Sequence, residues 1–409
     1  MDGTQQVVII GGGLAGAKTA EALRDHGFTG TVTLIAAEAH LPYERPPMSK
    51  SFLIGASPFD DALVHTAEWY REKEIDLRTG TRAIALDTGR HRVGLEDGDE
   101  VAYDKLVLAT GSTPRRLPVP GAEASGVHYL RTREDSDAIR STFGPGRRLV
   151  VIGGGWIGLE VAAAARGAGT EVCVVEAADL PLSAALGPEL AVVFADLHRA
   201  NGVDLRLSTR LNAVLTDGGR AVGVELDGGE RIDADGIVVG IGAVPQTGLA
   251  EAAGLAVDDG VLVDASLRTS DPDVYAVGDI ANHDHPALGR RMRVEHWAAA
   301  LNQPSVAAAA LLGGAERYTE LPYFYSDQYD LGMEYIGHSP EGSYDRIVVR
   351  GALAAQKFVA FWLDRDNRIK AAMNVNVWDV VDQIKHLIGD GRPIDPERLA
   401  DPGVPYAEL

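Results

Sequence analysis

The sequence predicts an α/β protein with two Rossmann-like dinucleotide-binding domains followed by a C-terminal α+β domain. A strand, a glycine-rich turn, a helix and a second strand follow one another over residues 5–36, and the same order recurs over residues 147–176. Two copies of one βαβ unit indicate two dinucleotide sites. From about residue 321 the chain changes to alternating apolar strands and one helical segment, which is typical of a small α+β domain.

These patterns predict three domains in a chain of 409 residues. We expect a discontinuous first domain that combines residues 1–113 and 247–320. Residues 114–246 would form the second domain, and residues 321–409 the third. Further buried strands are expected near residue 106, in the segment that ends near residue 247, and near residue 280, and the proline-rich segment 41–50 is expected not to be helical.

The first glycine turn has the G-x-G-x-x-G pattern in the context that this pattern requires. Gly11 permits the tight turn, Gly13 lets the backbone approach a pyrophosphate, and Gly16 lets the helix pack on the strand. The N–H groups at the helix start would face the phosphates. Glu38 is the candidate acceptor for the ribose hydroxyls, and its alternative is a charged residue of a surface loop.

The second glycine turn repeats the pattern with Gly153, Gly155 and Gly158. The strand after its helix ends at Glu176. A carboxylate there would accept hydrogen bonds from ribose hydroxyls and repel a 2′-phosphate, and no arginine follows directly to receive one. We therefore expect NADH rather than NADPH at the second site, unless Glu176 merely ends the strand at the surface.

Composition excludes several classes of function. The net charge of −21 argues against binding to nucleic acid or to anionic lipid. The apolar stretches are too short for a membrane span, and the N-terminus has no basic leader region, so we expect a cytoplasmic protein with no membrane association. The single cysteine, Cys173, cannot form an internal disulfide or a cysteine metal cluster. We expect it to be buried, and we expect no metal site at His283 and His285.

Seven segments together resemble the FAD-dependent ferredoxin reductases that serve cytochrome P450s and Rieske-type ring-hydroxylating dioxygenases. They are LPYERPPMSK, YDKLVLATGSTPR, VVIGGGWIGLEVA, GIGAVPQT, VYAVGDIA, RVEHWAAALNQ and LPYFYSDQYD. The wider group shares the two-dinucleotide-domain fold of glutathione reductase. The resemblance implies FAD at the first glycine turn and NADH at the second. One departure is Tyr325, which stands where the family often has tryptophan.

The resemblance also implies binding roles for individual residues. Arg45 and Lys50 would lie by the flavin, Asp279 would hold the ribitol or pyrophosphate side, and Trp297 would lie at the pyrimidine end of the isoalloxazine. Gly242 and Pro245 would line the nicotinamide side. The remaining expected cofactor-binding residues belong to the same motifs or lie near them: Leu14, Ala15, Ala37, Ala83, Ala109, Thr110, Gly111, Arg131, Ile157, Glu295 and His296.

Lys50 and Glu160 are the expected catalytic residues, again through the resemblance. Taken alone, Lys50 could be a solvated lysine and Glu160 a carboxylate near a helix start. Together they suggest an ion pair near the flavin N5 that opens when nicotinamide enters. A lysine there would stabilise the anionic reduced flavin.

The sequence therefore predicts an oxidoreductase that takes electrons from NADH through FAD to a [2Fe–2S] ferredoxin, which in turn feeds a P450 or Rieske-type oxygenase. Disulfide reduction is excluded because it needs a cysteine pair. A rubredoxin reductase, an NADH oxidase-type flavoenzyme and an apoptosis-inducing-factor-like flavoprotein stay open, as does the choice between monomer and dimer. Arg290, Arg291 and Arg293 form either a docking patch for an acidic ferredoxin or a solvated charged turn.

Overall fold

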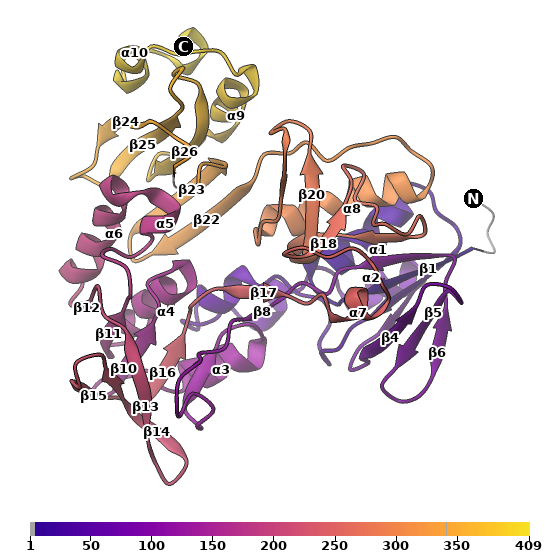
Figure 1. Ribbon diagram of the computed structural model, residues 1–409, viewed down its shortest axis with the longest axis horizontal. Helices are drawn as coiled ribbons and strands as arrows, with labels where there is room; N and C mark the ends of the chain where they lie inside the picture. The colour runs from indigo at the N-terminus through magenta and orange to yellow at the C-terminus, as the bar shows by residue number, and fades with distance from the viewer. Residues whose placement is uncertain (1–4, 341) are drawn as a thin grey trace. The chain divides into compact units, whose positions relative to one another are not determined.

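The computed structural model describes residues 5–340 and 342–409. Residues 1–4, part of the segment interpreted above as lacking a leader, lie outside the described residues. The chain divides into two compact units, each made of separate stretches of sequence (Figure 1). The first unit contains residues 1–45, 59–113 and 244–322, and the second contains residues 46–58, 114–243 and 323–409. This division by contacts leaves the three-domain organisation a prediction.

A five-stranded parallel sheet forms the centre of the first unit. Its strand order is β19 (Val274–Ala276), β7 (Lys105–Leu108), β1 (Gln6–Ile10), β2 (Thr31–Ile35) and β3 (Ile75–Arg78). β1 pairs with β2 on one side and with β7 on the other. The chain passes from β1 to β2 and β3 on one side of β1 and later returns to β7 on its other side. The strand order therefore reverses between β1 and β7, and their carboxyl ends form a topological switch point, where ligands bind in folds of this kind.

Helices α1 (Leu14–Asp25) and α8 (Trp297–Leu311) pack against each other in the first unit. Two small sheets complete it. One contains β4 (Ala83–Asp87), β5 (Arg92–Leu95) and β6 (Glu100–Ala102), and the other β18 (Val261–Val263), β20 (Ala281–His285) and β21 (Arg290–Met292). The short helices are η2 (Phe59–Ala62), α2 (Ala67–Glu72), α7 (Gly248–Ala252) and η3 (Gly278–Ile280).

The second unit repeats the parallel arrangement. Its sheet has the order β12 (Asp204–Arg206), β11 (Glu171–Val175), β10 (Arg148–Ile152), β16 (Gly236–Val239) and β9 (Val127–Tyr129). β10 takes the place that β1 has in the first unit, because β11 and β16 pair with its two edges. The accompanying elements are η1 (Pro46–Ser49), α3 (Arg133–Arg140), α4 (Trp156–Gly167), α5 (Ser183–Leu186), α6 (Pro188–Ala200), β13 (Leu211–Asp217), β14 (Arg220–Leu226) and β15 (Arg231–Asp233).

The C-terminal residues of the second unit form an antiparallel sheet. Its order is β22 (Tyr323–Gln328), β23 (Leu331–Gly337), β26 (Ile369–Val375), β25 (Lys357–Leu363) and β24 (Arg346–Ala352). It is followed by α9 (Val381–Asp390), α10 (Pro396–Ala400) and η4 (Tyr406–Glu408). The strands β8 (Ser112–Pro114) and β17 (Ala243–Pro245) pair with each other where the chain passes from one unit to the other.

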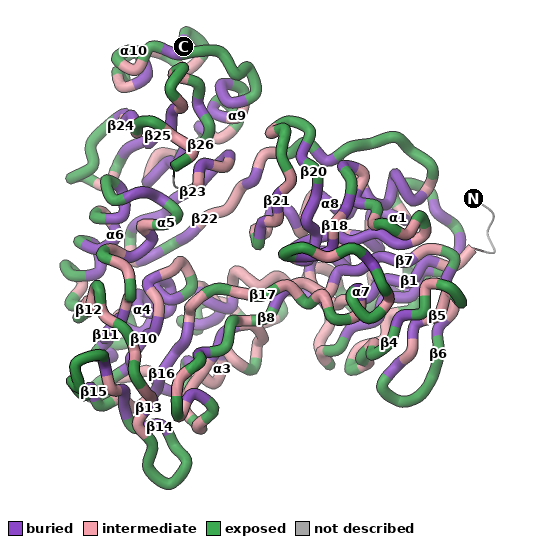
Figure 2. The backbone as a smooth tube through the Cα atoms, viewed as in Figure 1, coloured by how far each residue is buried: buried purple, intermediate pink, exposed green. Residues whose placement is uncertain are grey.

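Burial explains why the central strands are continuous apolar runs rather than alternating ones. The residues of β1 and β10 are almost completely buried after the first position of each strand, as the purple tube of Figure 2 shows. A parallel strand that is covered on both faces needs apolar side chains in both directions. Cys173 lies on β11 and is buried, as expected, and burial raises the pKa of its thiol to about 12.

Both helices after the glycine turns begin inside the glycine motif, at Leu14 and Trp156, because the chain becomes helical directly after Gly13 and Gly155. One local expectation differs from the structure, because the proline-rich segment is not entirely irregular. Pro46–Ser49 forms a short 3₁₀ turn, in which proline is tolerated because its missing N–H would have had no partner at a helix start. Among the described residues, no helix is both long and apolar enough to cross a membrane.

His283 on β20 predicts a loss of stability in weak acid. Its side chain is 1% exposed, and burial, followed by the neighbouring His285, lowers its pKa to about 4. The unfolded chain has an ordinary histidine pKa near 6.5, so it binds this proton more readily than the folded protein does as the pH falls from about 6.5 to 4. Between pH 7 and pH 5 this histidine should cost the folded protein about 2 kcal/mol.

Urea unfolding of the wild type and of His283→Leu at both pH values measures this contribution. The variant should lose about 2 kcal/mol less between pH 7 and pH 5 than the wild type does. Substitution of the exposed His386 by asparagine is the control and should follow the wild type. An equal pH dependence in all three proteins would contradict the assignment.

Candidate functional site

The first glycine turn is shaped by close approaches that only glycine allows. A Cβ atom at Gly11, where φ is +126°, would lie 2.1 Å from the carbonyl oxygen of Ala109, and one at Gly16 would lie 1.8 Å from the carbonyl oxygen of Gly11. Gly13, by contrast, has open space on its Cβ side. No side chain caps the start of α1, and its first turn carries no acidic residue. The turn therefore leaves the helix N-terminus available to an anion.

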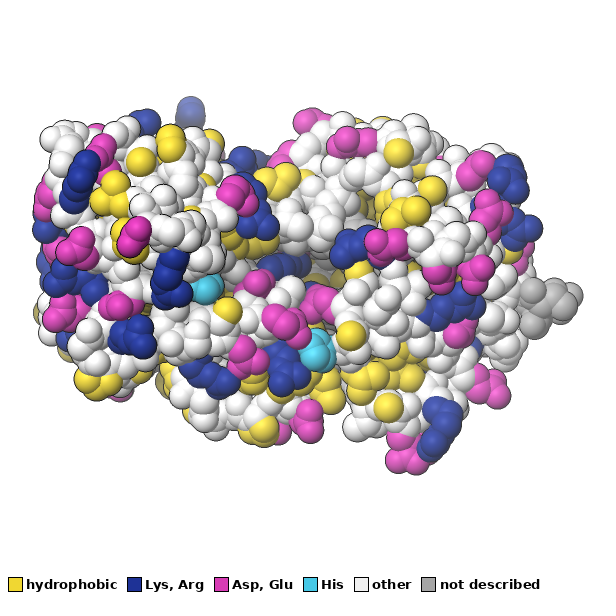
Figure 3. All heavy atoms as spheres, turned by 90° about the horizontal axis from the view of Figure 1, so that it is seen from below, with side chains coloured by type: hydrophobic (Ala, Val, Ile, Leu, Met, Phe, Trp, Pro, Cys, Tyr) yellow, Lys and Arg dark blue, Asp and Glu magenta, His cyan; other side chains and the backbone are white. Residues whose placement is uncertain are grey.

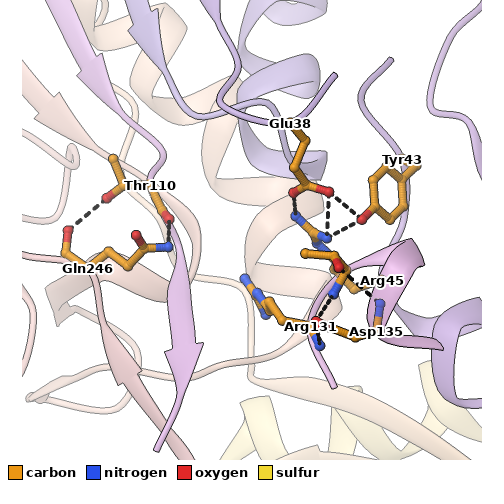
Figure 4. A network of polar contacts seen from close by, with 8 residues as sticks. Glu38, Tyr43, Arg45, Thr110, Arg131, Asp135 and Gln246 are labelled. Atoms are coloured by element: carbon orange, nitrogen blue, oxygen red, sulfur yellow. Dashed lines mark hydrogen bonds and ion pairs between the residues drawn. The ribbon is translucent and has the colours of Figure 1, made fainter. Parts of the chain in front are cut away.

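Glu38 lies just beyond β2, where it forms an ion pair instead of facing solvent alone. Figure 4 shows its carboxylate directed at Arg45 and Tyr43. The Glu38 Oε1 to Arg45 Nη2 distance is 2.5 Å, and the Tyr43 hydroxyl donates to Glu38 Oε2 at 2.6 Å. Binding of ribose by Glu38 stays a prediction.

Asp279 lies in η3, directly after β19, at the carboxyl edge of the first sheet. The Ser112 hydroxyl donates to Asp279 Oδ2 at 2.7 Å. Gly278, with φ of +75°, comes so close to α1 that an added Cβ would lie 3.0 Å from Ala15 Cβ, and its N–H donates to the Gln303 side chain at 2.7 Å. Gly278 and Asp279 thus lie beside the first glycine turn, within the same unit.

Trp297 begins α8, and its indole N–H donates to Glu44 Oε2 at 2.9 Å. This bond ties the helix start to the segment that carries Arg45. His296 is the half-buried residue before the helix, and Glu295 is exposed and pairs with Arg293 at 2.7 Å.

The other residues expected to contact FAD in the first unit have no charged side chains. Thr110 donates to the carbonyl oxygen of Gln246 at 2.9 Å, and the Gln246 amide donates back to the Thr110 carbonyl at 3.0 Å, as Figure 4 shows. Leu14, Ala15 and Ala109 are buried, Ala37 is exposed, and Ala83 and Gly111 are half-buried, as is Pro245, which we expect on the nicotinamide side. They can line a site only through backbone groups and apolar surface.

The second glycine turn has the same construction as the first. A Cβ at Gly153, where φ is +99°, would lie 2.4 Å from the carbonyl oxygen of Gly240, and one at Gly158 would lie 2.2 Å from the carbonyl oxygen of Gly153. Gly155 precedes α4, whose first turn has no acidic residue and no side-chain cap. Ile157 in this turn has 47% of its surface exposed, which is unusual for isoleucine and leaves an apolar face beside the turn.

Glu176 is held at the end of β11 by backbone donors. Its Oε2 accepts from the Gly154 N–H at 2.6 Å and its Oε1 from the Ala178 N–H at 2.7 Å. The carboxylate therefore turns toward the glycine turn. The neighbouring strand brings Arg206 alongside, but its guanidinium pairs with Asp204 and Glu230, at 2.8 and 3.1 Å. A 2′-phosphate would meet a carboxylate here and an arginine that is already neutralised.

Gly242 and Arg131 also lie in the second unit. Gly242 is exposed with φ of +101°, and its carbonyl oxygen accepts from the Arg115 N–H at 2.8 Å. Arg131 precedes α3, and its backbone N–H donates to the Asp135 side chain at 3.0 Å. Their expected contacts with the nicotinamide and with FAD stay predictions.

Lys50 and Glu160 form a largely buried ion pair within the second unit. The Lys50 Nζ to Glu160 Oε2 distance is 2.8 Å, and the two side chains are 15% and 4% exposed. The carboxylate also accepts from the Ser49 hydroxyl at 2.5 Å and from the Ser326 hydroxyl at 2.6 Å. Lys50 Nζ lies 5.4 Å from the centre of the Tyr325 ring. The pair therefore joins three stretches of sequence, and its role toward a flavin stays a prediction.

Sequence reasoning missed Ser49, Ser326 and Tyr43. Ser49 and Ser326 are separated from Glu160 by 111 and 166 residues, so no local pattern joins them. Ser49 and Ser326 each carried a weak signal, because both lie inside motifs that we singled out for other residues. Ser326 is a small polar residue among the aromatic residues of β22.

In the basic cluster Arg290, Arg291 and Arg293, Arg290 is exposed, whereas the other two arginines have acidic partners. Arg291 pairs with Asp284 at 2.9 Å, and Arg293 pairs with Asp259 at 3.0 Å as well as with Glu295. On the face drawn in Figure 3, acidic and basic side chains are interspersed. Arg290 and Arg291 lie on strand β21 and not in a turn, and the acidic partners of Arg291 and Arg293 favour a solvated charged surface over a docking patch. In the described part of the chain, no three or more His, Cys, Asp or Glu side chains are arranged to hold a metal ion.

The comparisons with known proteins match two family models. Residues 5–303 match the pyridine nucleotide-disulphide oxidoreductase model, and residues 323–409 match the reductase C-terminal model. The chain is 44% identical to the anthranilate 1,2-dioxygenase system ferredoxin–NAD(+) reductase component of Burkholderia cepacia, over 97% of each chain. It is 40% identical to putidaredoxin reductase of Pseudomonas putida, over 100% of this chain and 97% of the relative.

The fold has a solved counterpart. The covalent putidaredoxin reductase–putidaredoxin complex contains a chain that matches this one with a TM-score of 0.95 and 38% identity, over 100% of this chain and 98% of that chain. The predicted fold class, two dinucleotide-binding domains with a C-terminal domain, is confirmed by these matches.

Glu176→Ala tests the discrimination between the two nicotinamide dinucleotides. The change removes a carboxylate that we expect to bind the ribose hydroxyls, so the affinity for NADH should fall about tenfold, the effect of one lost charged hydrogen bond. The affinity for NADPH should stay the same or rise. Calorimetric titration of both nucleotides measures the two constants.

Glu171→Ala is the matched control, because Glu171 starts the same strand and is exposed. It should leave both affinities unchanged. An equal fall for NADH and NADPH in Glu176→Ala would show that the residue holds the turn and does not select the nucleotide.

Lys50→Met should destabilise the protein strongly, because it leaves the Glu160 carboxylate buried without its cation. Breaking a buried pair in this way costs about 3–5 kcal/mol of the free energy of unfolding. The double variant Lys50→Met with Glu160→Gln should lose clearly less stability than the sum of the losses in the two single variants. Urea unfolding of the three variants measures the coupling. Arg71→Met, which breaks the exposed Arg71–Glu68 pair, is the control and should cost less than about 1 kcal/mol. Additive effects of the Lys50 and Glu160 changes would contradict this interpretation.

Proposed function

Because the chain belongs to the pyridine nucleotide-disulphide oxidoreductase family and carries the reductase C-terminal domain, we propose that it is an FAD-dependent NADH reductase that passes electrons to a [2Fe–2S] ferredoxin. The observation that carries this proposal is the pair of matching glycine turns. Each follows the central strand of a parallel sheet and leads into a helix start that no side chain caps. Two such turns suit two dinucleotides in one chain.

The residues of the first turn fit the pyrophosphate of FAD. The approaches at Gly11 and Gly16 leave no room for side chains, while Gly13 has open space for a ligand. Asp279, close to this turn, offers a carboxylate for hydroxyl groups. The second turn fits NADH, because Glu176 faces the turn and Arg206 is engaged elsewhere. When bound, FAD supplies the conversion between the two-electron chemistry of NADH and the one-electron chemistry of an iron–sulfur protein.

We assign to Lys50 the supply of positive charge to the flavin, and to Glu160 the holding of Lys50. A lysine stabilises negative charge that develops on a neighbouring group, and a fixed lysine does so without having to reorganise. Glu160, with serine donors on both oxygens, is rigid enough to fix the ammonium. Tyr325 adds an aromatic ring on the same lysine.

Disulfide chemistry, which the family is named for, does not suit this chain. The sequence has one cysteine, Cys173, and it is buried on β11 with a raised pKa. A thiol of this kind is not nucleophilic and has no partner cysteine. The electrons must leave by another route, which is consistent with a protein acceptor.

The names of the relatives support a proposal for the electron acceptor and for the enzyme system it serves. Their names describe ferredoxin reductases of dioxygenase systems and a reductase of putidaredoxin. By the same chemistry, the partner of this chain is a [2Fe–2S] ferredoxin that feeds a cytochrome P450 or a Rieske-type oxygenase. We propose a cytoplasmic protein, monomeric or dimeric.

Anaerobic stopped-flow mixing tests the proposal. NADH should bleach the flavin absorbance at least about tenfold faster than NADPH does, since Glu176 disfavours the 2′-phosphate. A [2Fe–2S] ferredoxin added next should restore the oxidised flavin spectrum. Reoxidation by rubredoxin alone, or by oxygen alone, would favour the corresponding alternative enzyme, and no bleaching by either nucleotide would refute the proposal.

A further inference from the structure

A chain of buried polar side chains leads from Glu160 into the interior of the second unit. It runs through Ser326 and Gln328 on β22 to His198 on α6. The exposed fractions of Ser326, Gln328 and His198 are 0, 1 and 0%. Side chains of this kind are costly to bury, so each needs its partner. No part of the proposed reaction described so far uses His198 or Gln328.

The hydrogen bonds in this series of buried side chains all point in one direction, from His198 toward Glu160. The Ser326 hydroxyl donates to Glu160 Oε1 at 2.6 Å, and it accepts from Gln328 Nε2 at 3.2 Å. Because the Gln328 amide nitrogen is used in this way, its oxygen is the acceptor that faces His198 Nε2, at 2.9 Å. His198 must therefore carry its proton on Nε2. Its Nδ1 lies 3.4 Å from the Tyr329 hydroxyl, which can donate to it.

The environment of His198 favours this neutral form. Burial lowers the pKa of His198, although the bond to Gln328 acts in the opposite direction. The Tyr329 hydroxyl keeps its proton, since burial raises its pKa to about 12. Every donor in the chain is thus directed toward the Glu160 carboxylate. Hydrogen bonds aligned in one direction strengthen one another, and the last of them ends on a charge.

We propose that His198 is a positioning residue for the Lys50–Glu160 pair. His198 orients the Gln328 amide, and Gln328 in turn orients the Ser326 hydroxyl. Ser326 then fixes Glu160 Oε1, so that Glu160 Oε2 stays directed at Lys50. This inference deepens the proposed function and rests on it only for the consequence toward the flavin. Without His198, the Gln328 side-chain oxygen loses the N–H that donates to it, and the amide can turn over. Ser326 then loses its donor, and Glu160 and Lys50 gain freedom to move.

Other charged and titratable groups also face this pair. Asp327 on β22 interacts electrostatically with both Lys50 and Glu160, and Glu334 on β23 interacts with Asp327. Tyr323 donates to Glu334 at 2.7 Å, which keeps that carboxylate engaged. None of these groups replaces the Ser326 hydrogen bond to Glu160 Oε1, so the variants below isolate the His198 route.

Two substitutions of His198 separate positioning from packing. His198→Leu removes the donor with a similar volume, and His198→Gln places an amide N–H where Nε2 stood. The first readout needs no reaction: the ¹³C NMR signal of the Glu160 carboxyl in glutamate-labelled holoprotein, assigned by its loss in Glu160→Gln. The signal should shift in His198→Leu and return toward the wild-type position in His198→Gln.

The second readout is the reduction of the flavin by NADH in stopped-flow experiments. The limiting rate should fall about tenfold in His198→Leu, whereas the apparent dissociation constant of NADH should stay within about twofold, because a positioning residue acts on the reacting geometry more than on binding. His198→Gln should recover most of the rate. His283→Leu, which removes another buried histidine, is the control and should match the wild type in both readouts.

Three outcomes would overturn the inference. His198→Leu could keep the wild-type Glu160 signal and limiting rate and lower only the melting temperature. His283→Leu could lose as much of the limiting rate as His198→Leu does, or His198→Gln could recover neither the signal nor the rate. Ser326→Ala and Gln328→Leu provide the same test if His198→Leu does not fold, and both should shift the Glu160 signal. If NADH does not reduce the wild-type flavin, the proposed function fails, and the NMR readout alone still decides the role of His198.

Discussion

The structure depends on one steric constraint, the contact of a helix start with the end of a central strand at each glycine turn. At Gly16 and at Gly158 the approach to a backbone oxygen is so short that any side chain would separate helix from sheet. Because α1 and α4 can begin directly over β1 and β10, the N-terminal N–H groups lie at the switch point of each sheet. All later features of the two binding regions are arranged around these two positions.

The second organising feature is the carboxylate of Glu160. A buried charge is tolerated only when its partners satisfy it, and here the partners come from η1, β22 and, through them, α6. The partners of this carboxylate link the proline-rich segment and the C-terminal sheet to α4, the helix that carries Glu160. The same contacts that make the site possible thus also hold parts of the second unit together.

The fold class and the position of both glycine turns could be predicted from the sequence, because strand, turn and helix patterns are local. The acceptor role of Glu176 toward backbone N–H groups could not, since it depends on how Gly154 and Ala178 are turned. The ion pair of Glu38 with Arg45, and the serine contacts of Glu160, were missed for the same reason. The sequence shows the arginine cluster near residue 291, but the pairing of Arg293 with Asp259 could not be foreseen, because Asp259 lies 34 residues away along the chain.

The discontinuous make-up of both units has a consequence for synthesis on the ribosome. The first unit needs residues up to Pro322, which include its edge strand β19 and helix α8. The second unit needs both Pro46–Pro58 and the last residues of the chain. The core of the first unit includes residues of β19 and α8, so it cannot be complete until most of the polypeptide has emerged. One core cluster of the second unit draws only on residues 117–239 and can therefore form earlier in translation.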